Sequence, residues 1–265
     1  MRYLRLLVSF ARISLMGELS FRVNFLLKIL VEVLWLGILL IFYKTIFSKS
    51  SSVSGWDEYQ YLFFLGAYYT LEGFVETFFL ENCVEFSELV RSGNLDFFLL
   101  KPIDEQFLLT FRKIDWSTAP KIFLGLGLMS IGAMDLGITF EPFRVFWFLV
   151  LLFMGFSLAY SFLLVLTSLG VWLVRNQSLM EIWWLFTNLM RYPRSIYQPS
   201  WALPIRVVFG VFIPALLAVS VPAEYFLGKS DWSGIALLSI STGFFIWLSR
   251  WFFFYSLRHY QSASS

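Results

Sequence analysis

Long apolar runs dominate this chain, and short polar segments separate them. Five runs are clear from the pattern of hydrophobic and polar positions: 22–47, 58–80, 118–136, 144–174 and 233–257. A helix needs about 20 predominantly apolar residues to cross the hydrocarbon core of a bilayer. Each run therefore predicts a membrane-spanning helix. We expect the polar segments 48–57, 81–116 and 137–143 to lie outside the hydrocarbon core.

The segment 175–232 allows two interpretations. In the first, 178–196 is a short fifth span, and 204–228 is a re-entrant segment that dips into the membrane and returns. In the second, 175–206 stays in the cytoplasm and 207–226 is the fifth span. Both interpretations give six spans and place both termini in the cytoplasm.

Two sequence features bear on this choice. Pro214 and Pro222 interrupt the apolar segment, and irregular backbone at membrane depth requires surrounding protein. Three arginines lie outside in the first interpretation and inside in the second: Arg191, Arg194 and Arg206. Cytoplasmic loops are enriched in Lys and Arg, so the charge distribution favours the second interpretation. In both, most of the 20 basic residues lie on the cytoplasmic side.

Residues 1–21 predict a helix that lies in the membrane interface. Basic and apolar side chains alternate there with helical spacing: Arg2, Arg5 and Arg12 among Leu4, Leu7, Val8, Ala11 and Leu15. Such a helix presses its apolar groups into the acyl boundary and keeps its cations near the headgroups.

Composition agrees with a membrane protein. The chain is 58% hydrophobic and 21% aromatic, and only 14% of its residues are charged, whereas about 25% is usual in soluble domains. One cysteine, Cys83, excludes an internal disulfide, and one histidine, His259, leaves no His/Cys metal cluster. A net charge of +2 gives no reason to expect nucleic acid. We therefore predict an all-α polytopic membrane protein of one domain, 1–265, with six transmembrane helices and no cofactor, metal or catalytic centre.

Four charged residues fall inside predicted spans: Lys28, Glu32, Glu72 and Glu76. Each costs about 2.5–3.5 kcal/mol at the membrane centre unless it is paired or hydrated. Lys28 and Glu32 share a helix face, as do Glu72 and Glu76, because each pair is four residues apart. The depths of the two pairs match, so we expect Lys28 to bridge to the glutamates. A structural ion pair is one interpretation, and a proton relay or polar substrate path is the other.

The polar segment 81–116 has a distinctive start. Glu81, Glu85 and Glu88 continue one face of the second span, and Gly93-Asn94 is typical of a helix end. An apolar turn follows at 95–100, and Lys101-Pro102 ends it. A connecting loop does not require apolar side chains outside the membrane. They either lie in the interface or insert into a groove on a partner.

The same loop resembles the membrane subunit of bacterial type-2 ATP-binding-cassette (ABC) exporters. The pattern Arg-x-Gly-x-Leu-Asp-x-x-Leu-Leu-Lys-Pro is matched by Arg91, Gly93, Leu95, Asp96, Leu99, Leu100, Lys101 and Pro102. The segment 191–197, with Pro214 and Pro222-Ala223 after it, resembles a second, weaker signature of these permeases. Lengths and span order agree over essentially the whole chain.

The resemblance implies a permease that hydrolyses no ATP itself. In that family the loop forms a coupling helix that enters a groove on a separate ATPase subunit, so the matched residues and Glu88 are the expected contacts. It also implies two ATPase copies, a second identical or related permease, and a bacterial cytoplasmic (inner) membrane. A re-entrant pair before the sixth span is a family feature, which favours the first interpretation of 175–232.

Two other functional classes are compatible with the same residues. A proton-coupled secondary transporter would use Glu72 and Glu76, and a non-transporting membrane assembly factor would use neither. The sequence does not identify the transported substrate.

Overall fold

A computed structural model describes residues 2–138, 141–173, 177–199 and 202–261. Every regular element among these residues is a helix, and the β-structure within them is a single isolated bridge between Val53 and Trp56. The fold is therefore all-helical, as the apolar runs predicted.

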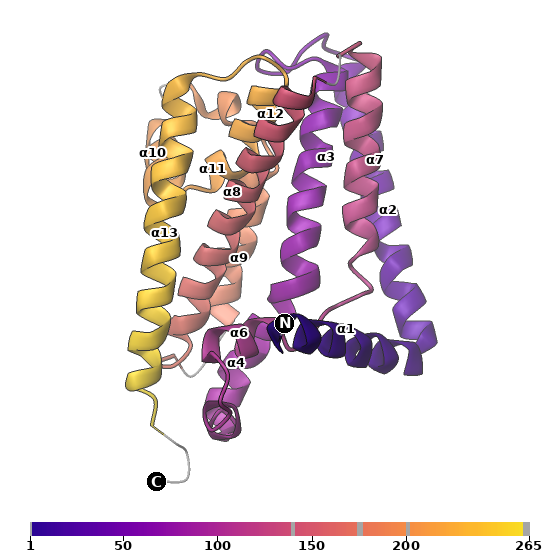
Figure 1. Cartoon of the computed structure of the whole chain (residues 1–265). Coiled ribbons are helices and arrows are strands. Elements are labelled where there is room, and N and C mark those ends of the chain that lie inside the picture. The colour runs from indigo at the N-terminus through magenta and orange to yellow at the C-terminus, as the bar shows by residue number, and fades with distance from the viewer. Residues whose placement is uncertain (1, 139–140, 174–176, 200–201, 262–265) are drawn as a thin grey trace.

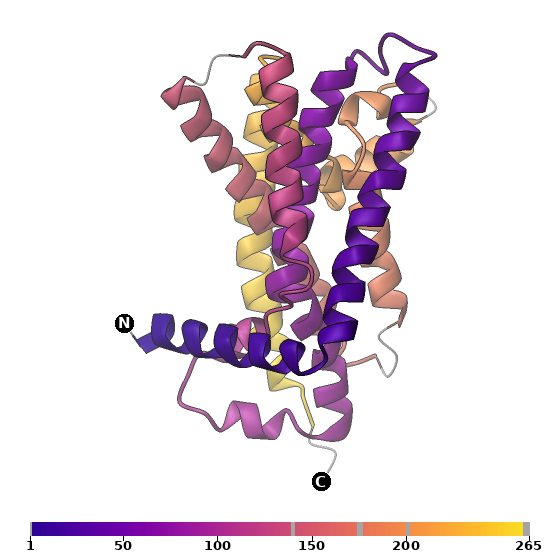
Figure 2. The ribbon, with the colours of Figure 1, turned by 90° about the vertical axis from the view of Figure 1, so that its right-hand side faces the viewer.

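The first two helices form an elbow. Helix α1 (Arg2–Ser20) lies across the end of the long helices, and the chain turns at Phe21 into α2 (Arg22–Phe47), which runs the length of the molecule (Figures 1 and 2). Only Leu36 and Tyr43 of α2 are buried, so this helix stands at the edge of the bundle.

The next helix extends beyond the bundle. Helix α3 (Glu58–Val75) begins with a capping box of Asp57 and Gln60, which satisfies free N–H groups of its first turn. It continues without a break through a π-helical turn, η1 (Glu76–Leu80), into α4 (Glu81–Ser92). The result is one helical rod whose far end protrudes from the base in Figure 1.

The chain turns at the tip of this rod and returns. Gly93 ends α4 with a φ of 73°, a left-handed conformation that glycine adopts without strain. The following elements are α5 (Asp96–Leu99), α6 (Glu105–Phe111) and α7 (Pro120–Asp135). Helix α7 then runs back beside α3 (Figure 1).

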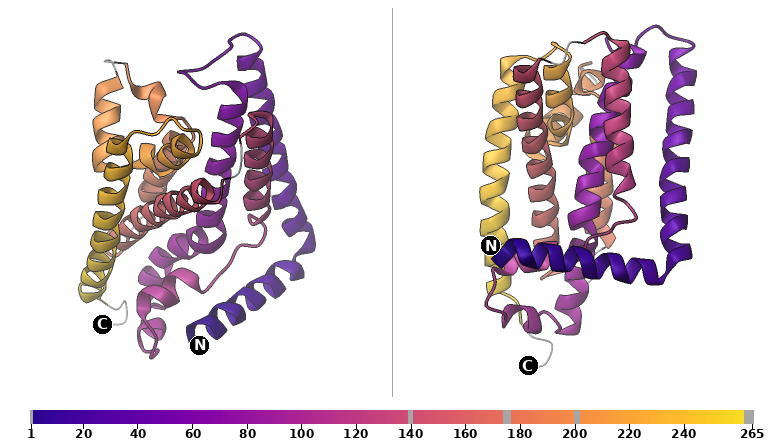
Figure 3. Two further views of the ribbon diagram at one scale, coloured as in Figure 1. Left: turned by 45° about the horizontal axis from the view of Figure 1, so that its top comes forward. Right: turned by 45° about the vertical axis from the view of Figure 1, so that its right-hand side comes forward.

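The second half of the chain contains a bent segment between long helices. Its elements are α8 (Pro142–Leu169), α9 (Gln177–Met190), η2 (Arg194–Tyr197), α10 (Leu203–Val207), η4 (Val208–Phe212), α11 (Ala215–Ala218), α12 (Ser220–Phe226) and α13 (Trp232–Arg258). Figure 3 shows α10 to α12 gathered at the end of the molecule away from α1.

Contacts define the direction of the chain through this half. The indole N–H of Trp56 donates to Ser195 Oγ at 3.0 Å, and Lys229 Nζ donates to the carbonyl of Gly55 at 2.6 Å. Ser195 and Lys229 therefore both adjoin the 48–57 loop, at the end opposite α4. Helix α9 leads toward that end, which is the path that the first interpretation of 175–232 describes.

Three helices are each long and apolar enough to cross a membrane: α2, α8 and α13. The stretches Leu203–Gly210 and Ala215–Phe226 are long and apolar enough to cross a membrane only when taken together, and their axes meet at a bend of 73°. The count among the described residues is three, or four with this pair. The remaining predicted spans correspond to shorter helices, so six spans stay a prediction.

Glycines allow α3 and α7 to pack closely. A Cβ at Gly66 would lie 2.5 Å from the backbone N of Met129, and one at Gly125 would lie 2.5 Å from the backbone N of Thr70. Small residues bring helix backbones together in membranes, where lipid supplies no hydrophobic drive for association. Most of α3 is buried in this way, so α3 and α7 form the centre of the fold.

We expect Gly125→Ala to destabilise the protein by about 1–3 kcal/mol, because overpacking forces the two helices apart. Gly127→Ala is the matched control on the same helix, since its Cβ would meet no described atom within 4 Å. That change should be neutral or stabilise by up to about 1 kcal/mol through helix propensity. Thermal unfolding in detergent, followed by size-exclusion chromatography, measures both, and equal melting temperatures would contradict the close packing.

A second prediction concerns the path of 177–199. In a Cys83→Ser background, a cysteine replacing Gln198 should react with a membrane-impermeant thiol reagent in intact cells, as should one replacing Ser52 in the 48–57 loop. A cysteine replacing Ser92, at the tip of the rod, should react only after the cells are opened. Gln198, Ser52 and Ser92 are all exposed. Protection of position 198 together with labelling of position 52 would contradict this path.

Candidate functional site

One lysine collects three carboxylates inside the bundle. Lys121 Nζ lies 2.9 Å from Glu72 Oε2, 2.9 Å from Glu76 Oε2 and 3.7 Å from Glu32 Oε2. The side chains of Lys121, Glu72 and Glu76 are 8%, 7% and 9% exposed. Tyr68 Oη donates to Glu72 Oε1 at 2.5 Å. These residues form the Lys121 cluster, which joins α2, α3 and α7.

The predicted partner of the glutamates was wrong. Lys28 Nζ instead lies 3.3 Å from Asp115 Oδ2, and its side chain is 48% exposed. Pro120 starts α7, so Lys121 projects from its first turn beside α3, whereas Lys28 faces the connection before α7. Both lysines lie near the same end of the bundle, and depth alone did not distinguish them. Glu72 and Glu76 lie together as their spacing predicted, and Glu32 joins them at Lys121.

A pocket of about 520 Å³ lies beside the Lys121 cluster. Helices α2, α3 and α9 contribute most of its walls, and many lining residues are aromatic or polar: Trp35, Phe42, Tyr68, Tyr69, Trp184, Thr187, Asn188, Arg191 and Tyr192. Arg191 contacts the Tyr192 hydroxyl at 3.3 Å. Carboxylates, one ammonium and aromatic faces thus line one hollow between an edge helix and the bundle. Among the described residues, no group of His, Cys, Asp and Glu side chains could hold a metal ion.

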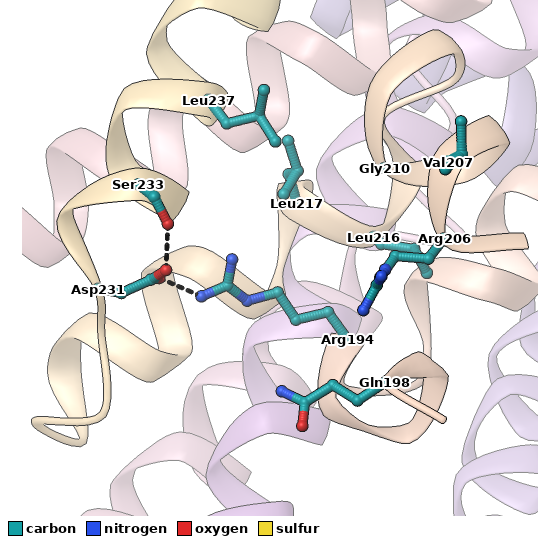
Figure 4. A pocket seen from close by; sticks show the side chains of 10 residues that line it. All are labelled: Arg194, Gln198, Arg206, Val207, Gly210, Leu216, Leu217, Asp231, Ser233 and Leu237. Carbon is teal, nitrogen blue, oxygen red and sulfur yellow. Dashed lines mark hydrogen bonds and ion pairs between the residues drawn. The ribbon is translucent and has the colours of Figure 1, made fainter. Parts of the chain in front are cut away.

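A second pocket, of about 430 Å³, lies at the end away from α4 (Figure 4). Arg194 spans it: Nε contacts the two carboxylate oxygens of Glu224 at 2.9 and 2.8 Å, and its NH2 group contacts Asp231 Oδ1 at 2.5 Å. Hydrogen bonds from Ser233 and Arg194 lower the pKa of Asp231 to about 2. This network ties η2, α12 and the start of α13 together, and the spacing of its members in the sequence did not indicate it.

The tip of the rod presents an uneven surface. Leu95 is fully buried against Phe86, Leu109 and Phe253, so its side chain belongs to the chain's own core. Phe97 and Leu100 point outward, with 66% and 82% of their surface exposed.

The other residues of the motif surround that exposed pair. Asp96 begins α5, and Leu99 is partly buried. Glu88 and Arg91 form an exposed pair at 2.7 Å, and Lys101 Nζ lies 4.6 Å from the centre of the Phe98 ring. Lys101 and Pro102 are exposed after the turn, and Gly93 provides its bend. Of the motif's three leucines, Leu100 alone is largely exposed.

A salt bridge fastens the return of this loop to the last helix. Arg250 of α13 contacts Asp104 Oδ2 at 2.9 Å and Gln106 Oε1 at 2.9 Å. Asp104 also caps α6 by accepting from the Phe107 N–H at 2.9 Å. Burial opposes ionisation of Asp104, but the hydrogen bonds from Arg250 and Phe107 outweigh it and lower its pKa. The tip is therefore anchored to both α3 and α13.

Comparison with known families agrees with the loop motif. A family model described as an ABC-2 family transporter protein matches residues 33–264. The chain therefore belongs to the ABC-2 transporter family and is a membrane protein of that family, as the resemblance predicted. Neither the curated proteins nor the solved structures contain a match.

Replacing Lys121 tests the cluster. We expect Lys121→Met to destabilise the protein by about 3–5 kcal/mol, because it leaves buried carboxylates unpaired. Adding Glu72→Gln and Glu76→Gln should recover much of that loss. Lys28→Met, whose salt bridge is half-exposed, is the control and should cost at most about 1 kcal/mol. Unfolding in mixed micelles measures all of these, and equal losses for the two lysines would refute the assignment.

Proposed function

We propose that this chain is the permease subunit of an ABC exporter. Its translocation path would form with a second permease, identical or related, and two copies of a separate ATPase subunit would drive it. The family match over residues 33–264 carries this proposal. The protruding α4–α6 element and the pocket beside the Lys121 cluster add structural support.

The tip of the rod suits a groove on an ATPase. Phe97 and Leu100 are exposed apolar groups within a rim of charge that includes Glu88, Arg91 and Lys101. An apolar centre with a polar rim is typical of protein interfaces. In this proposal Phe97 and Leu100 enter the groove, Glu88, Arg91 and Lys101 contact its edge, and Leu95 shapes the turn from within.

The rod offers a mechanical route from that tip to the pocket. Helix α4 is continuous with α3 through η1, and α3 carries Glu72 and Glu76. A displacement of the tip by the ATPase therefore moves the wall of the pocket directly. The salt bridge between Arg250 and Asp104 passes the same displacement to α13. ATP-driven closure of the two ATPases would alternate the pocket between the two sides of the membrane.

The proposed orientation follows from the same contact. The tip must lie in the cytoplasm, where ATP is, so α1 and both termini lie on that side of the bacterial inner membrane. The 48–57 loop and η2 then face outward, and α10 to α12 form the re-entrant segment. Export is the direction proposed from the resemblance of the loop motif.

A proton-coupled transporter remains the second candidate because three carboxylates share one lysine in the Lys121 cluster. Such a protein would move substrate with a proton gradient and without ATP. The permease proposal requires ATP and an ATPase subunit. If the permease proposal holds, neutralising Glu72 would lower the stability of the protein more than it would affect the coupling of transport to ATP.

Leu100→Arg tests the permease proposal. When the chain is produced together with a candidate ABC ATPase subunit from the same genome, the variant should retain at least about tenfold less ATPase on an affinity column than the unchanged chain, because a charge cannot enter an apolar groove. Leu100→Met keeps the apolar contact and should behave as the unchanged chain. Both proteins should elute as folded permease on size exclusion. Equal retention of the ATPase by Leu100→Arg would refute the docking surface.

A further inference from the structure

One carboxylate of the pocket beside the Lys121 cluster is open to a ligand. Glu32 lies 3.7 Å from Lys121 Nζ, the longest of the three distances, and its side chain is 22% exposed. Glu72 and Glu76 are buried, and each accepts a hydrogen bond, from Tyr68 and from Lys121. Glu32 accepts none from the part of the chain that the structure describes, and it lines the pocket. Its carboxylate is therefore the member of the cluster that a bound group can reach.

Aromatic side chains stand directly beside that carboxylate. Trp35 follows Glu32 by three residues on α2, so the two side chains are neighbours on one helix face, with about 5–6 Å between their Cβ atoms. Trp35 is largely exposed and lines the pocket, and Trp184 of α9 adds a second, half-exposed indole to the lining. One group placed next to Glu32 therefore meets an indole as well as a carboxylate.

The charges of the lining do not balance. Three carboxylates face two cations, Lys121 and Arg191. Lys121 is surrounded by all three carboxylates, whereas Arg191 forms no ion pair among the described residues and contacts the hydroxyl and the ring of Tyr192. A charge in a low-dielectric interior is costly unless another charge compensates it. One further positive charge, carried by a ligand or by a proton, would balance the lining.

The aromatic walls indicate what kind of cation suits this position. The face of an aromatic ring attracts cations, indole most strongly, and quaternary ammonium ligands are recognised in this way. Ile38 and Leu39 of α2 add apolar surface to the same lining. A small hydrated ion would leave these indoles and aliphatic groups without contacts. A positive charge on an apolar body would use both the carboxylate and the walls.

We propose that this pocket binds lipophilic organic cations and that such cations are the class of substrate that the chain exports. The positive charge lies between the Glu32 carboxylate and the Trp35 ring, and the apolar substituents extend toward Trp184. The substrate assignment rests on the proposed function, because the pocket carries a substrate only if the chain forms a translocation path.

Two ions of the same shape and opposite charge test the inference. The purified full chain in a nonionic detergent is dialysed to equilibrium against tetraphenylphosphonium or tetraphenylborate, and uptake by protein-free micelles is subtracted. We expect the phosphonium to bind at least about tenfold more tightly than the borate, because the open carboxylate attracts one charge and repels the other. This comparison uses the unchanged chain and needs no ATPase.

Two variants assign the preference to the pocket. Glu32→Gln should reduce the preference for the phosphonium at least about threefold, because it removes the opposite charge. Trp35→Leu should weaken phosphonium binding about three- to tenfold, because it removes the ring face but keeps an apolar side chain. Glu141→Gln and Trp147→Leu are the matched controls, since neither residue lines the pocket, and both should bind as the unchanged chain does. Size-exclusion chromatography and melting temperatures identify a misfolded variant.

Several results would overturn the proposal. They are equal binding of the two ions, tighter binding of the borate, binding of neither ion, and an unchanged preference in folded Glu32→Gln. A pocket that a proton neutralises would show no preference for the phosphonium. The retention experiment with Leu100→Arg separates this inference from the permease assignment. Retention of the ATPase without phosphonium binding overturns the substrate class alone, and phosphonium binding without ATPase retention overturns export by an ABC system while the cation site stands.

Discussion

The ion pairs of Lys121 are the constraint on which the rest of this structure depends. A charge in a low-dielectric interior is stabilised only when it is paired, and here one ammonium meets Glu32, Glu72 and Glu76 from two other helices. Rotating α3 or sliding α7 by a turn would separate a carboxylate from its partner. The cluster therefore fixes the depth and rotation of α2, α3 and α7 together, and the glycine contacts of α3 and α7 make that geometry attainable.

Helix α2 shows how few contacts are needed once that centre is set. Its apolar side chains mostly face away from the bundle, so packing contributes little to holding it. Polar contacts hold it at three heights instead: Lys28 with Asp115, Glu32 with Lys121, and the Tyr43 hydroxyl with that of Tyr61 at 3.1 Å. Because the contacts are local, a hollow remains between α2 and α9, and the aromatic pocket occupies it.

The parts predicted well from sequence are those that one rule governs. Apolar run length located α2 at 22–47 and α3 with η1 at 58–80, because every membrane helix must satisfy its backbone internally. No such rule says which side chains of two neighbouring helices will meet. The sequence therefore predicted that Lys28 pairs with Glu72 and Glu76, whereas Lys121 does so. The loop motif lies at the tip of the rod, and its pattern does not distinguish the buried Leu95 from the exposed Leu100. Which side a short turn shows to its own core depends on α6, α8 and α13, which the motif does not include.

A similar distinction explains why counting basic residues favours the second interpretation of 175–232, whereas the structure leads α9 toward the 48–57 loop. The positive-inside rule treats each arginine alike, as a charge that resists transfer across the membrane. Arg194 has a structural role as well, because it joins Glu224 and Asp231 where the bent segment meets α13. Moving it to the other end would leave Glu224, which is buried, without its partner. The position of Arg194 in this structure therefore follows from its ion pairs with Glu224 and Asp231, which a count of basic residues does not take into account.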